Sequence, residues 1–301
     1  MSPERAETLI PPKFRTVGLI AKHGDTRVGE TLGRLIGMLR ARGLDVVLDD
    51  RSRKAHPNHD LPVVARDGLG QQCDLIIVVA GDGTFLSAAR SLVDQDVPLL
   101  GVNLGRLGFL ADVMPDEMSD RLNEILDGDY VEERRFLLDV TVERNSERVF
   151  AGPALNEAVT HKGSMARLVE FETYIDGHLV NSQRSDGLIV ATPTGSTAYA
   201  LSGGGPILHP SLDAIVLVSI CPHTLSSRPV VVSGGSVVEV VLGENAESSV
   251  QLSCDGQTTA ELAAGDRISI RKRRPDLRLI HPAGHEYYAT LRAKLHWGKG
   301  L

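Results

Sequence analysis

A carboxylate between two glycines is the feature of the sequence best suited to chemistry. Asp82 stands in Gly-Asp-Gly-Thr at residues 81–84, directly after an apolar run at residues 75–80. Glycines can adopt unusual backbone angles and allow a ligand to approach the main chain, and amides that enter a following helix attract phosphate. A carboxylate beside phosphate would hold a divalent metal ion or remove a proton from an attacking hydroxyl. The alternative is an aspartate that only closes a turn, and residue 82 alone favours neither.

A second stretch collects small polar side chains. An apolar segment at residues 188–191 runs into Thr-Pro-Thr-Gly-Ser-Thr at residues 192–197, and three glycines follow at residues 203–205. So many hydroxyl groups suit a ribose or a phosphate, and Tyr199 could stack on a ligand or hydrogen-bond to it. A surface loop rich in Ser and Thr is the alternative, but the glycines favour close approach of a ligand to the main chain.

The elements around Asp82 alternate between strand and helix. The apolar strands are unbroken, which is typical of a parallel sheet covered on both faces. Asp82 would then lie at the carboxyl end of a parallel strand, the edge where open α/β sheets bind ligands. The pattern predicts strands at residues 14–21, 44–48, 75–79 and 97–102, helices at 26–42, 85–92 and 115–126, and a polar loop at 51–60.

From about residue 130 the pattern changes to β-branched segments separated by turns, such as residues 137–142, 168–175 and 230–242. Asp176-Gly177 predicts a hairpin, and Asp127-Gly128 predicts the end of a helix. The expected fold is an N-terminal open parallel-sheet α/β domain followed by a mostly β C-terminal domain. Its expected boundaries are residues 1–129, residues 130–285, and a C-terminal helix at 286–301 that could pack back on the first domain.

Composition narrows the setting. The chain has 301 residues, of which 42% are hydrophobic, and no run of about 18 apolar residues that would span a membrane. A net charge of -7 argues against a nucleic-acid partner, and the basic run at residues 271–274 is expected to be a solvated loop or strand end. The three cysteines form no CxxC pair, and the N-terminus lacks the features of a secretory signal, so a cytoplasmic location is expected.

Common catalytic motifs are absent from the sequence. No GxxxxGK[ST] occurs, and GxGxxG fails because residue 86 is Leu, which excludes a P-loop enzyme and a standard Rossmann dehydrogenase. HExxH and GxSxG are also missing, which argues against a zinc protease and an α/β-hydrolase.

Five sequence blocks together resemble the bacterial NAD kinases. The Gly-Asp-Gly-Thr loop alone is shared with lipid kinases and phosphofructokinases, whereas DGLIVATPTGSTAY with an upstream Asn-Glu pair is specific to this family. One departure is Ala80, where the family usually has glycine, and a methyl group is tolerated there if the residue has negative φ. The blocks are GDGTFL (81–86), GVNLGRLGFL (101–110), LNEAV (155–159), DGLIVATPTGSTAYALS (186–202) and SCDGQ (253–257).

The resemblance implies transfer of the γ-phosphoryl group of ATP, or of polyphosphate, to the 2'-hydroxyl of the adenosine ribose of NAD. NADP would be the product, and a divalent metal ion, expected to be Mg²⁺, would take part. Asp82 would be the catalytic base, and Gly81, Gly83 and Thr84 would form the phosphate-donor loop. The domain at residues 130–285 would bind NAD.

The resemblance also implies residues that hold NAD. Asn156 and Glu157 would bind the ribose and adenine part, Asp186 the nicotinamide end, and Arg167 and Arg184 the phosphates, with a surface salt bridge as the alternative for each arginine. Arg184 is also associated with the oxidised form of the nucleotide. His223 would lie near the phosphate donor unless its role is structural. The implied NAD-binding set is Asp82, Gly83, Asn156, Glu157, Arg167, Arg184, Asp186, Thr197, Ala198, Tyr199, Ala200, Leu201, Ser202 and Gln257.

Members of this family assemble as dimers or tetramers that share the NAD site, so a homodimer or homotetramer is expected. Three alternatives arise from the same residues: a lipid or other small-molecule kinase, an NADP-binding sensor without chemistry, and a dehydrogenase. The first leaves Asn156-Glu157 and the 192–199 turn without a role. A sensor would gain nothing from a carboxylate near phosphates, and the missing GxGxxG argues against the dehydrogenase.

Overall fold

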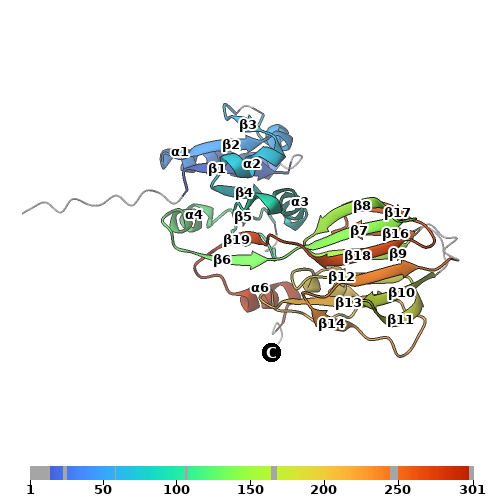
Figure 1. Cartoon of the computed structure of the whole chain (residues 1–301). Coiled ribbons are helices and arrows are strands. Elements are labelled where there is room, and N and C mark those ends of the chain that lie inside the picture. The colour runs from blue at the N-terminus through green and yellow to red at the C-terminus, as the bar shows by residue number, and fades with distance from the viewer. Residues whose placement is uncertain are drawn as a thin grey trace, which may run out of the picture. The chain divides into compact units, whose positions relative to one another are not determined.

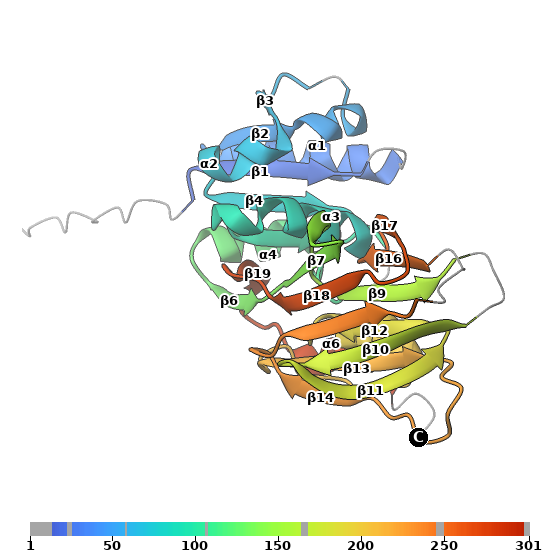
Figure 2. The same ribbon diagram turned by 45° about the vertical axis from the view of Figure 1, so that its right-hand side comes forward.

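The computed structural model describes residues 14–22, 26–57, 59–105, 108–163, 168–244 and 250–297 (Figures 1 and 2). The chain divides into two compact units, which are Met1–Glu133 together with Arg278–Leu301, and Arg134–Leu277. The first unit is built on a parallel sheet and the second on antiparallel sheets, so the predicted fold class is confirmed. No helix in the described part of the chain is long and apolar enough to cross a membrane.

The first unit contains a seven-stranded sheet of order β3-β2-β1-β4-β5-β19-β6. The pairings from β3 to β19 are parallel. All five residues of β4 are buried, as expected for a strand covered on both faces. The strands are β1 (Thr16–Ala21), β2 (Asp45–Asp49), β3 (Val63–Val64), β4 (Leu75–Val79), β5 (Leu99–Val102), β6 (Tyr130–Arg135) and β19 (Leu277–Pro282).

Helices α1 and α4 share one apolar core with this sheet. The predicted apolar spacing of α1 is confirmed, since Val28, Leu32, Leu35, Ile36 and Leu39 are all buried there. Helix α4 begins three residues later than predicted but buries Met118, Leu122 and Ile125 in the same cluster. The helices are α1 (Thr26–Ala41), α2 (Leu69–Gln72), α3 (Asp82–Leu92), α4 (Met118–Leu126) and α6 (Tyr287–Leu295), with 3₁₀ turns η1 (Asp50–Ala55), η2 (Arg66–Gly68) and η3 (Val93–Gln95).

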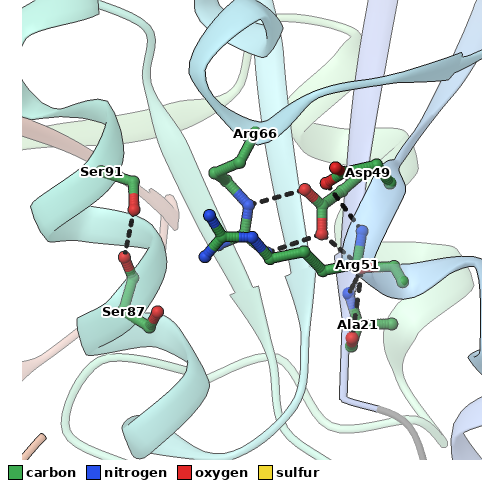
Figure 3. A network of polar contacts seen from close by, with 8 residues as sticks. Ala21, Asp49, Arg51, Arg66, Ser87 and Ser91 are labelled. Carbon is green, nitrogen blue, oxygen red and sulfur yellow. Dashed lines mark hydrogen bonds and ion pairs between the residues drawn. The ribbon is translucent and has the colours of Figure 1, made fainter.

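A buried polar network joins the ends of β1 and β2. The guanidinium of Arg66 donates to both carboxylate oxygens of Asp49, at 2.7 and 2.6 Å, and the two side chains are only 5% and 0% exposed (Figure 3). Ser52 donates to Asp49 at 2.8 Å and accepts the backbone N–H of Ala21 at 2.9 Å. The predicted polar loop at residues 51–60 is therefore wrong in part, because residues 51–55 belong to the 3₁₀ turn η1. This turn places Ser52 within hydrogen-bond distance of both strand ends.

The second unit consists of two six-stranded antiparallel sheets, of order β11-β10-β15-β18-β7-β8 and β14-β13-β12-β9-β16-β17. One apolar core includes residues of both sheets, such as Val140 and Phe171 from one and Leu188 and Leu252 from the other. The elements are β7 (Leu138–Arg144), β8 (Glu147–Ala154), β9 (Glu157–Lys162), β10 (Val169–Ile175), β11 (His178–Ser185), β12 (Gly187–Ala191), β13 (Ala214–Ile220), β14 (Val230–Ser233), β15 (Val238–Leu242), β16 (Val250–Cys254), β17 (Thr258–Leu262), β18 (Arg267–Lys272), the 3₁₀ turn η4 (Gly195–Thr197) and α5 (Tyr199–Ser202).

Turn residues predicted part of this unit correctly. Asp176 and Gly177 have φ of 51° and 78° and connect β10 to β11, which confirms the hairpin. The β-branched segment at residues 230–242 contains two strands, β14 and β15, which lie in different sheets. The chain turns between them at Gly234, where a β-carbon would lie 2.0 Å from Oδ1 of Asp213.

Two strand assignments differ from the sequence-based domains. Strands β6 and β19 belong to the parallel sheet of the first unit, although their residues were assigned to the β-rich domain.

The basic run at residues 271–274 forms ion pairs, with Arg271 and Arg273 on Asp139 and Lys272 on Asp213. These pairs at the end of β18 agree with the expected strand end.

Candidate active site

Asp82 begins helix α3 immediately after the carboxyl end of β4. The helix starts three residues earlier than predicted, because the N–H groups of Thr84 and Phe85 already bond to the carbonyl of Gly81 at 3.1 and 3.3 Å. Phe85 and Leu86 are buried and anchor this first turn. Strand β4 lies between β1 and β5 in the sheet, so the carboxylate stands at the centre of the sheet's carboxyl edge and at the positive end of a helix dipole.

The carboxylate of Asp82 packs against Gly108. A β-carbon at residue 108 would lie 2.4 Å from Oδ1 of Asp82 and 2.9 Å from the carbonyl oxygen of Ala111, so only glycine fits. Oδ1 of Asp82 is buried and has no hydrogen-bond partner among the described residues. Burial of a carboxylate oxygen without a partner is costly, so this oxygen is a candidate contact for a ligand.

The glycines beside Asp82 do not use the unusual backbone angles expected of them. Gly81 has φ of −79°, and neither Gly81 nor Gly83 is among the described residues with positive φ, so that expectation is wrong. A β-carbon on Gly81 would meet nothing within 4 Å, so the space above its main chain is open. Ala80 also lacks positive φ, and the methyl group that replaces the usual glycine is accommodated.

In the second unit, the Asn156-Glu157 pair packs directly on the 192–197 turn. Thr192 donates its hydroxyl to the carbonyl of Leu155 at 2.6 Å and its backbone N–H to the carbonyl of Asn156 at 2.9 Å. A β-carbon on Gly195 would lie 2.1 Å from that Asn156 carbonyl oxygen, so the close approach requires glycine. The structure therefore brings together two motifs that are far apart in the sequence.

Asp255 holds the same segment from the other side. Its carboxylate accepts the backbone N–H groups of Leu155, Asn156 and Glu157 at 3.0, 2.8 and 3.2 Å. Asp255 and Gly256 have φ of 52° and 64° and form the turn between β16 and β17. A buried carboxylate with this many donors orients the start of β9 and with it the Glu157 side chain.

Glu157 is a carboxyl group in a perturbed environment. Burial, together with the negative charge of Asp255, raises the pKa of Glu157 to about 8, and the backbone amide of Tyr199 offsets only part of this. The side chain is 7% exposed, and its Oε2 has no hydrogen-bond partner among the described residues. At neutral pH Glu157 is therefore mostly protonated and can donate as well as accept a hydrogen bond.

The segment after the turn divides into exposed and buried parts. Tyr199 is 47% exposed, whereas Ala200 is buried with Val216 and Val218 in a small apolar core. β-Carbons on Gly203 and Gly205 would each lie 2.8 Å from a methyl group of Val218. These glycines serve packing against β13, so the expectation that they admit a ligand to the main chain is wrong.

Arg184 and Asp186 each have a charged partner. Arg184, at the end of β11, pairs with Glu170 at 2.5 Å, and Asp186 pairs with Lys162 at 2.6 Å. Arg184 lines a cavity of about 690 Å³ together with His223 and Arg228. The backbone N–H of His223 donates to the backbone carbonyl of Arg184 at 2.9 Å. Two guanidinium groups beside hydroxyl-bearing side chains make this cavity suitable for an anionic ligand.

Comparisons with known proteins identify the family of this chain. A family model described as the ATP-NAD kinase N-terminal domain matches residues 17–130, and one described as the ATP-NAD kinase C-terminal domain matches residues 155–282. An NAD kinase of Nitrosococcus oceani is 53% identical over 288 residues, covering 96% of this chain and 98% of that protein. An NAD kinase of Pseudomonas entomophila is 50% identical over 289 residues, with coverage of 96% and 98%. The chain belongs to the NAD kinase family.

Two solved structures of kinases that act on this kind of nucleotide have a similar fold. A crystal structure of an NAD kinase from Archaeoglobus fulgidus in complex with ATP matches with a TM-score of 0.72 and 25% identity, over 92% of this chain and 99% of that one. The crystal structure of yeast NADH kinase complexed with NADH matches in fold with a TM-score of 0.86 at 24% identity, over 97% of this chain and 90% of that one. The resemblance to NAD kinases predicted from the sequence is confirmed.

The residues expected to act in an NAD kinase fall into separate groups. Gly81, Asp82, Gly83 and Thr84 lie together at the start of α3 in the first unit. Asn156, Glu157 and residues 197–202 lie together in the second unit, where Gln257 is exposed beside the turn that contains Asp255. Arg167 lies outside the described residues.

The sequence assigned no role to four residues that contact expected site residues of their own unit: Gly108 beside Asp82, and Gly195, Asp255 and Lys162 beside Asn156, Glu157 or Asp186. Gly108, Gly195 and Asp255 stood inside blocks that carry the family resemblance, and that was the available signal. Their roles depend on backbone approach or on distant contacts, as between Asp255 and Asn156, which are 99 residues apart.

Proposed function

We propose that this protein is an NAD kinase that transfers the γ-phosphoryl group of ATP to the 2'-hydroxyl of the adenosine ribose of NAD, producing NADP. The observation that carries the proposal is the buried, unpartnered oxygen of Asp82 at the carboxyl edge of the parallel sheet. Family membership and the match to an NAD kinase bound to ATP support ATP as the donor. Polyphosphate would serve as donor through the same terminal phosphate.

Asp82 acts as the general base. Its carboxylate takes the proton of the ribose hydroxyl while the oxygen attacks the γ-phosphorus, the bond from that phosphorus to the β-phosphate oxygen breaks, and ADP leaves. Gly81, Gly83 and Thr84 at the start of α3 hold phosphate through backbone amides and the helix dipole. Proton removal by a well-placed base contributes a factor of ~10² to 10⁴ in rate.

A divalent cation, Mg²⁺, fits the donor set at this loop. Its preferred ligands are carboxylate and phosphate oxygens, and the unpartnered oxygen of Asp82 is of this kind. When bound with ATP, the ion supplies neutralisation of phosphate charge.

The second unit binds NAD. Asn156 and the protonated Glu157 bind the adenosine part, because an amide and a neutral carboxyl each offer a donor and an acceptor to ribose hydroxyls. The exposed ring of Tyr199 stacks on the adenine, which Thr197, Ala198, Leu201, Ser202 and Gln257 line. Ala200, also expected there, is buried in the apolar core beneath this segment. Asp186 contacts the nicotinamide end, and Arg167 and Arg184 bind phosphate. A homodimer or homotetramer in the cytoplasm, where reduced cysteines such as Cys73 persist, completes the proposal.

An assay of NADP formation with ATP, Mg²⁺ and NAD tests the proposal. Wild type and Asp82→Asn are purified in parallel, and NAD binding is measured for both. The expected result is NADP formation by the wild type, and turnover lower by a factor of ~10² or more in Asp82→Asn with NAD affinity kept. A wild type that binds NAD or NADP but forms no NADP with ATP or polyphosphate would instead be a nucleotide sensor.

A further inference from the structure

The first unit contains a second group of possible ligands, formed by Asp112, His281 and His285. Nδ1 of His281 lies 3.0 Å and Nδ1 of His285 lies 2.7 Å from the same carboxylate oxygen of Asp112. The two imidazole rings stack with centroids 4.1 Å apart. One ligand atom from each of the three residues lies within 4.8 Å of the others, so a small shift would place all three around one ion.

Asp112 lies in a mostly buried position, where one of its carboxylate oxygens contacts both imidazole rings. The side chains of His281, Asp112 and His285 are 1%, 9% and 9% exposed. The second oxygen of Asp112 is buried and has no hydrogen-bond partner among the described residues. The group therefore has a carboxylate oxygen with unused capacity to bind.

The surroundings resemble those of a metal centre. Nε2 of His281, on the ring side away from Asp112, faces the Glu133 carboxylate at 3.6 Å. A histidine that binds a metal ion through one nitrogen commonly directs the other to a carboxylate, which fixes the ring orientation. Asp112 and His285 also line a cavity of about 360 Å³ with Glu117, Arg121 and Glu286. This cavity gives an ion a path of entry and leaves room for a water ligand.

We propose that Asp112, His281 and His285 bind a divalent transition-metal ion, with Zn²⁺ as the best match, and that water from the cavity completes the coordination. Two imidazoles, one carboxylate and an open position form a donor set that suits Zn²⁺, whereas Mg²⁺ prefers oxygen ligands. Its three ligands are different residues from Asp82, which is the residue proposed to face Mg²⁺ and ATP.

The ion has a positioning role for the loop that faces Asp82. It joins residue 112 to two residues that are 169 and 173 positions away in the sequence. The neighbours of Asp112 hold that loop, since Ala111 accepts the N–H of Gly108 at 3.1 Å and Val113 accepts the N–H of Asn103 at 2.9 Å. Gly108 is the residue that packs on the Asp82 carboxylate. This role rests on the proposed function, whereas metal binding itself does not.

The experiment measures metal binding by the full chain without turnover. The protein is stripped with a chelator, equilibrated with Zn²⁺ and dialysed, and its metal content is determined. We expect about one Zn²⁺ per chain, a Tm that rises with Zn²⁺ concentration, and a visible Co²⁺ spectrum of low coordination number. A wild type that retains no metal after dialysis would overturn the proposal, even if it forms NADP.

Zn²⁺ binding by single-residue variants distinguishes the proposed site from binding by surface histidines. His285→Gln should weaken Zn²⁺ binding by more than ~100-fold, and Glu133→Gln, which removes the charge facing His281, by ~10-fold. His178→Gln, at an exposed hairpin, is the matched control and should bind as the wild type does. Equal loss in the control, or unchanged binding in a His285→Gln protein with wild-type circular dichroism, would contradict the assignment.

Discussion

Gly108 lies so close to Asp82 that a β-carbon at residue 108 would stand 2.4 Å from the Asp82 carboxylate. The same β-carbon would meet the carbonyl of Ala111 at 2.9 Å, so a rotamer change of Asp82 alone does not relieve both contacts. The position of the proposed base therefore depends on the absence of one methyl group in a neighbouring loop.

Gly108→Ala should lower kcat by ~10²-fold, because a displacement of about 1 Å in a catalytic group has an effect of this size. NAD affinity should change little, since Asn156 and Glu157 lie in the other unit. Gly105→Ala is the matched control, because its nearest contact would be at 4.0 Å. Steady-state kinetics and NAD titration of both variants check this. Equal kcat in the two variants would show that Gly108 does not position Asp82.

The raised pKa of Glu157 predicts how stability depends on pH. The carboxyl group of Glu157 has a pKa of about 8 in the folded protein, whereas its ordinary value, expected for the unfolded chain, is 4.5. The folded state therefore binds more protons between these values, and the free energy of unfolding falls as pH rises through that range. The contribution of the Glu157 proton to the free energy of unfolding is fully present below about pH 4.5 and is lost above about pH 8.

Glu157→Gln removes this titration while keeping the shape of the side chain. Between about pH 5 and about pH 9, denaturant unfolding should show a steeper loss of stability in the wild type than in Glu157→Gln. If the free energy of unfolding depended on pH in the same way in both proteins, the Glu157 carboxyl would not be buried in its neutral form.

Asp255 predicts a linked effect on stability and on Glu157. Asp255→Asn leaves one acceptor oxygen where the carboxylate has two, although three backbone N–H groups converge there. The free energy of unfolding should fall by ~1 to 3 kcal/mol, the cost of an unsatisfied buried donor. The pKa of Glu157 should also fall, because the negative charge that helps to raise it is gone.

Asp176→Asn is the control for Asp255→Asn, since Asp176 also occupies a turn with positive φ but is exposed. Its expected change is within about 0.5 kcal/mol. Urea unfolding of both variants, with the pH profile repeated for Asp255→Asn, tests the two effects separately. If Asp255→Asn and Asp176→Asn unfolded with equal free energies, the hydrogen bonds from residues 155–157 to Asp255 would not stabilise the fold.

The sequence predicted those features whose cause is local. The buried run before Asp82 placed the carboxylate at the end of a parallel strand, because unbroken apolar strands that alternate with helices are typical of a covered parallel sheet. Asp176-Gly177 predicted its hairpin because both residues favour positive φ. The sheet exchange between β14 and β15, and the contact of Asp255 with Asn156, depend on pairing across long separations, and no local pattern encodes them.

Gly195 provides a sharp test of how the second unit's site is assembled. Gly195→Ala would place a β-carbon 2.1 Å from the carbonyl oxygen of Asn156, in a segment also held by Thr192. The turn would have to move away from Asn156 and Glu157, so we expect a loss of ~1 to 3 kcal/mol in stability and at least ~10-fold weaker NAD binding.

Gly37→Ala is the matched control, because residue 37 lies within helix α1 and its β-carbon would meet nothing within 4 Å. That substitution should stabilise the protein by ~0.5 to 1 kcal/mol through higher helix propensity, and NAD affinity should stay the same. The two glycine substitutions therefore have opposite expected signs for the free energy of unfolding. A Gly195→Ala protein that binds NAD as tightly as Gly37→Ala would show that the contact between the turn and Asn156 does not shape the nucleotide site.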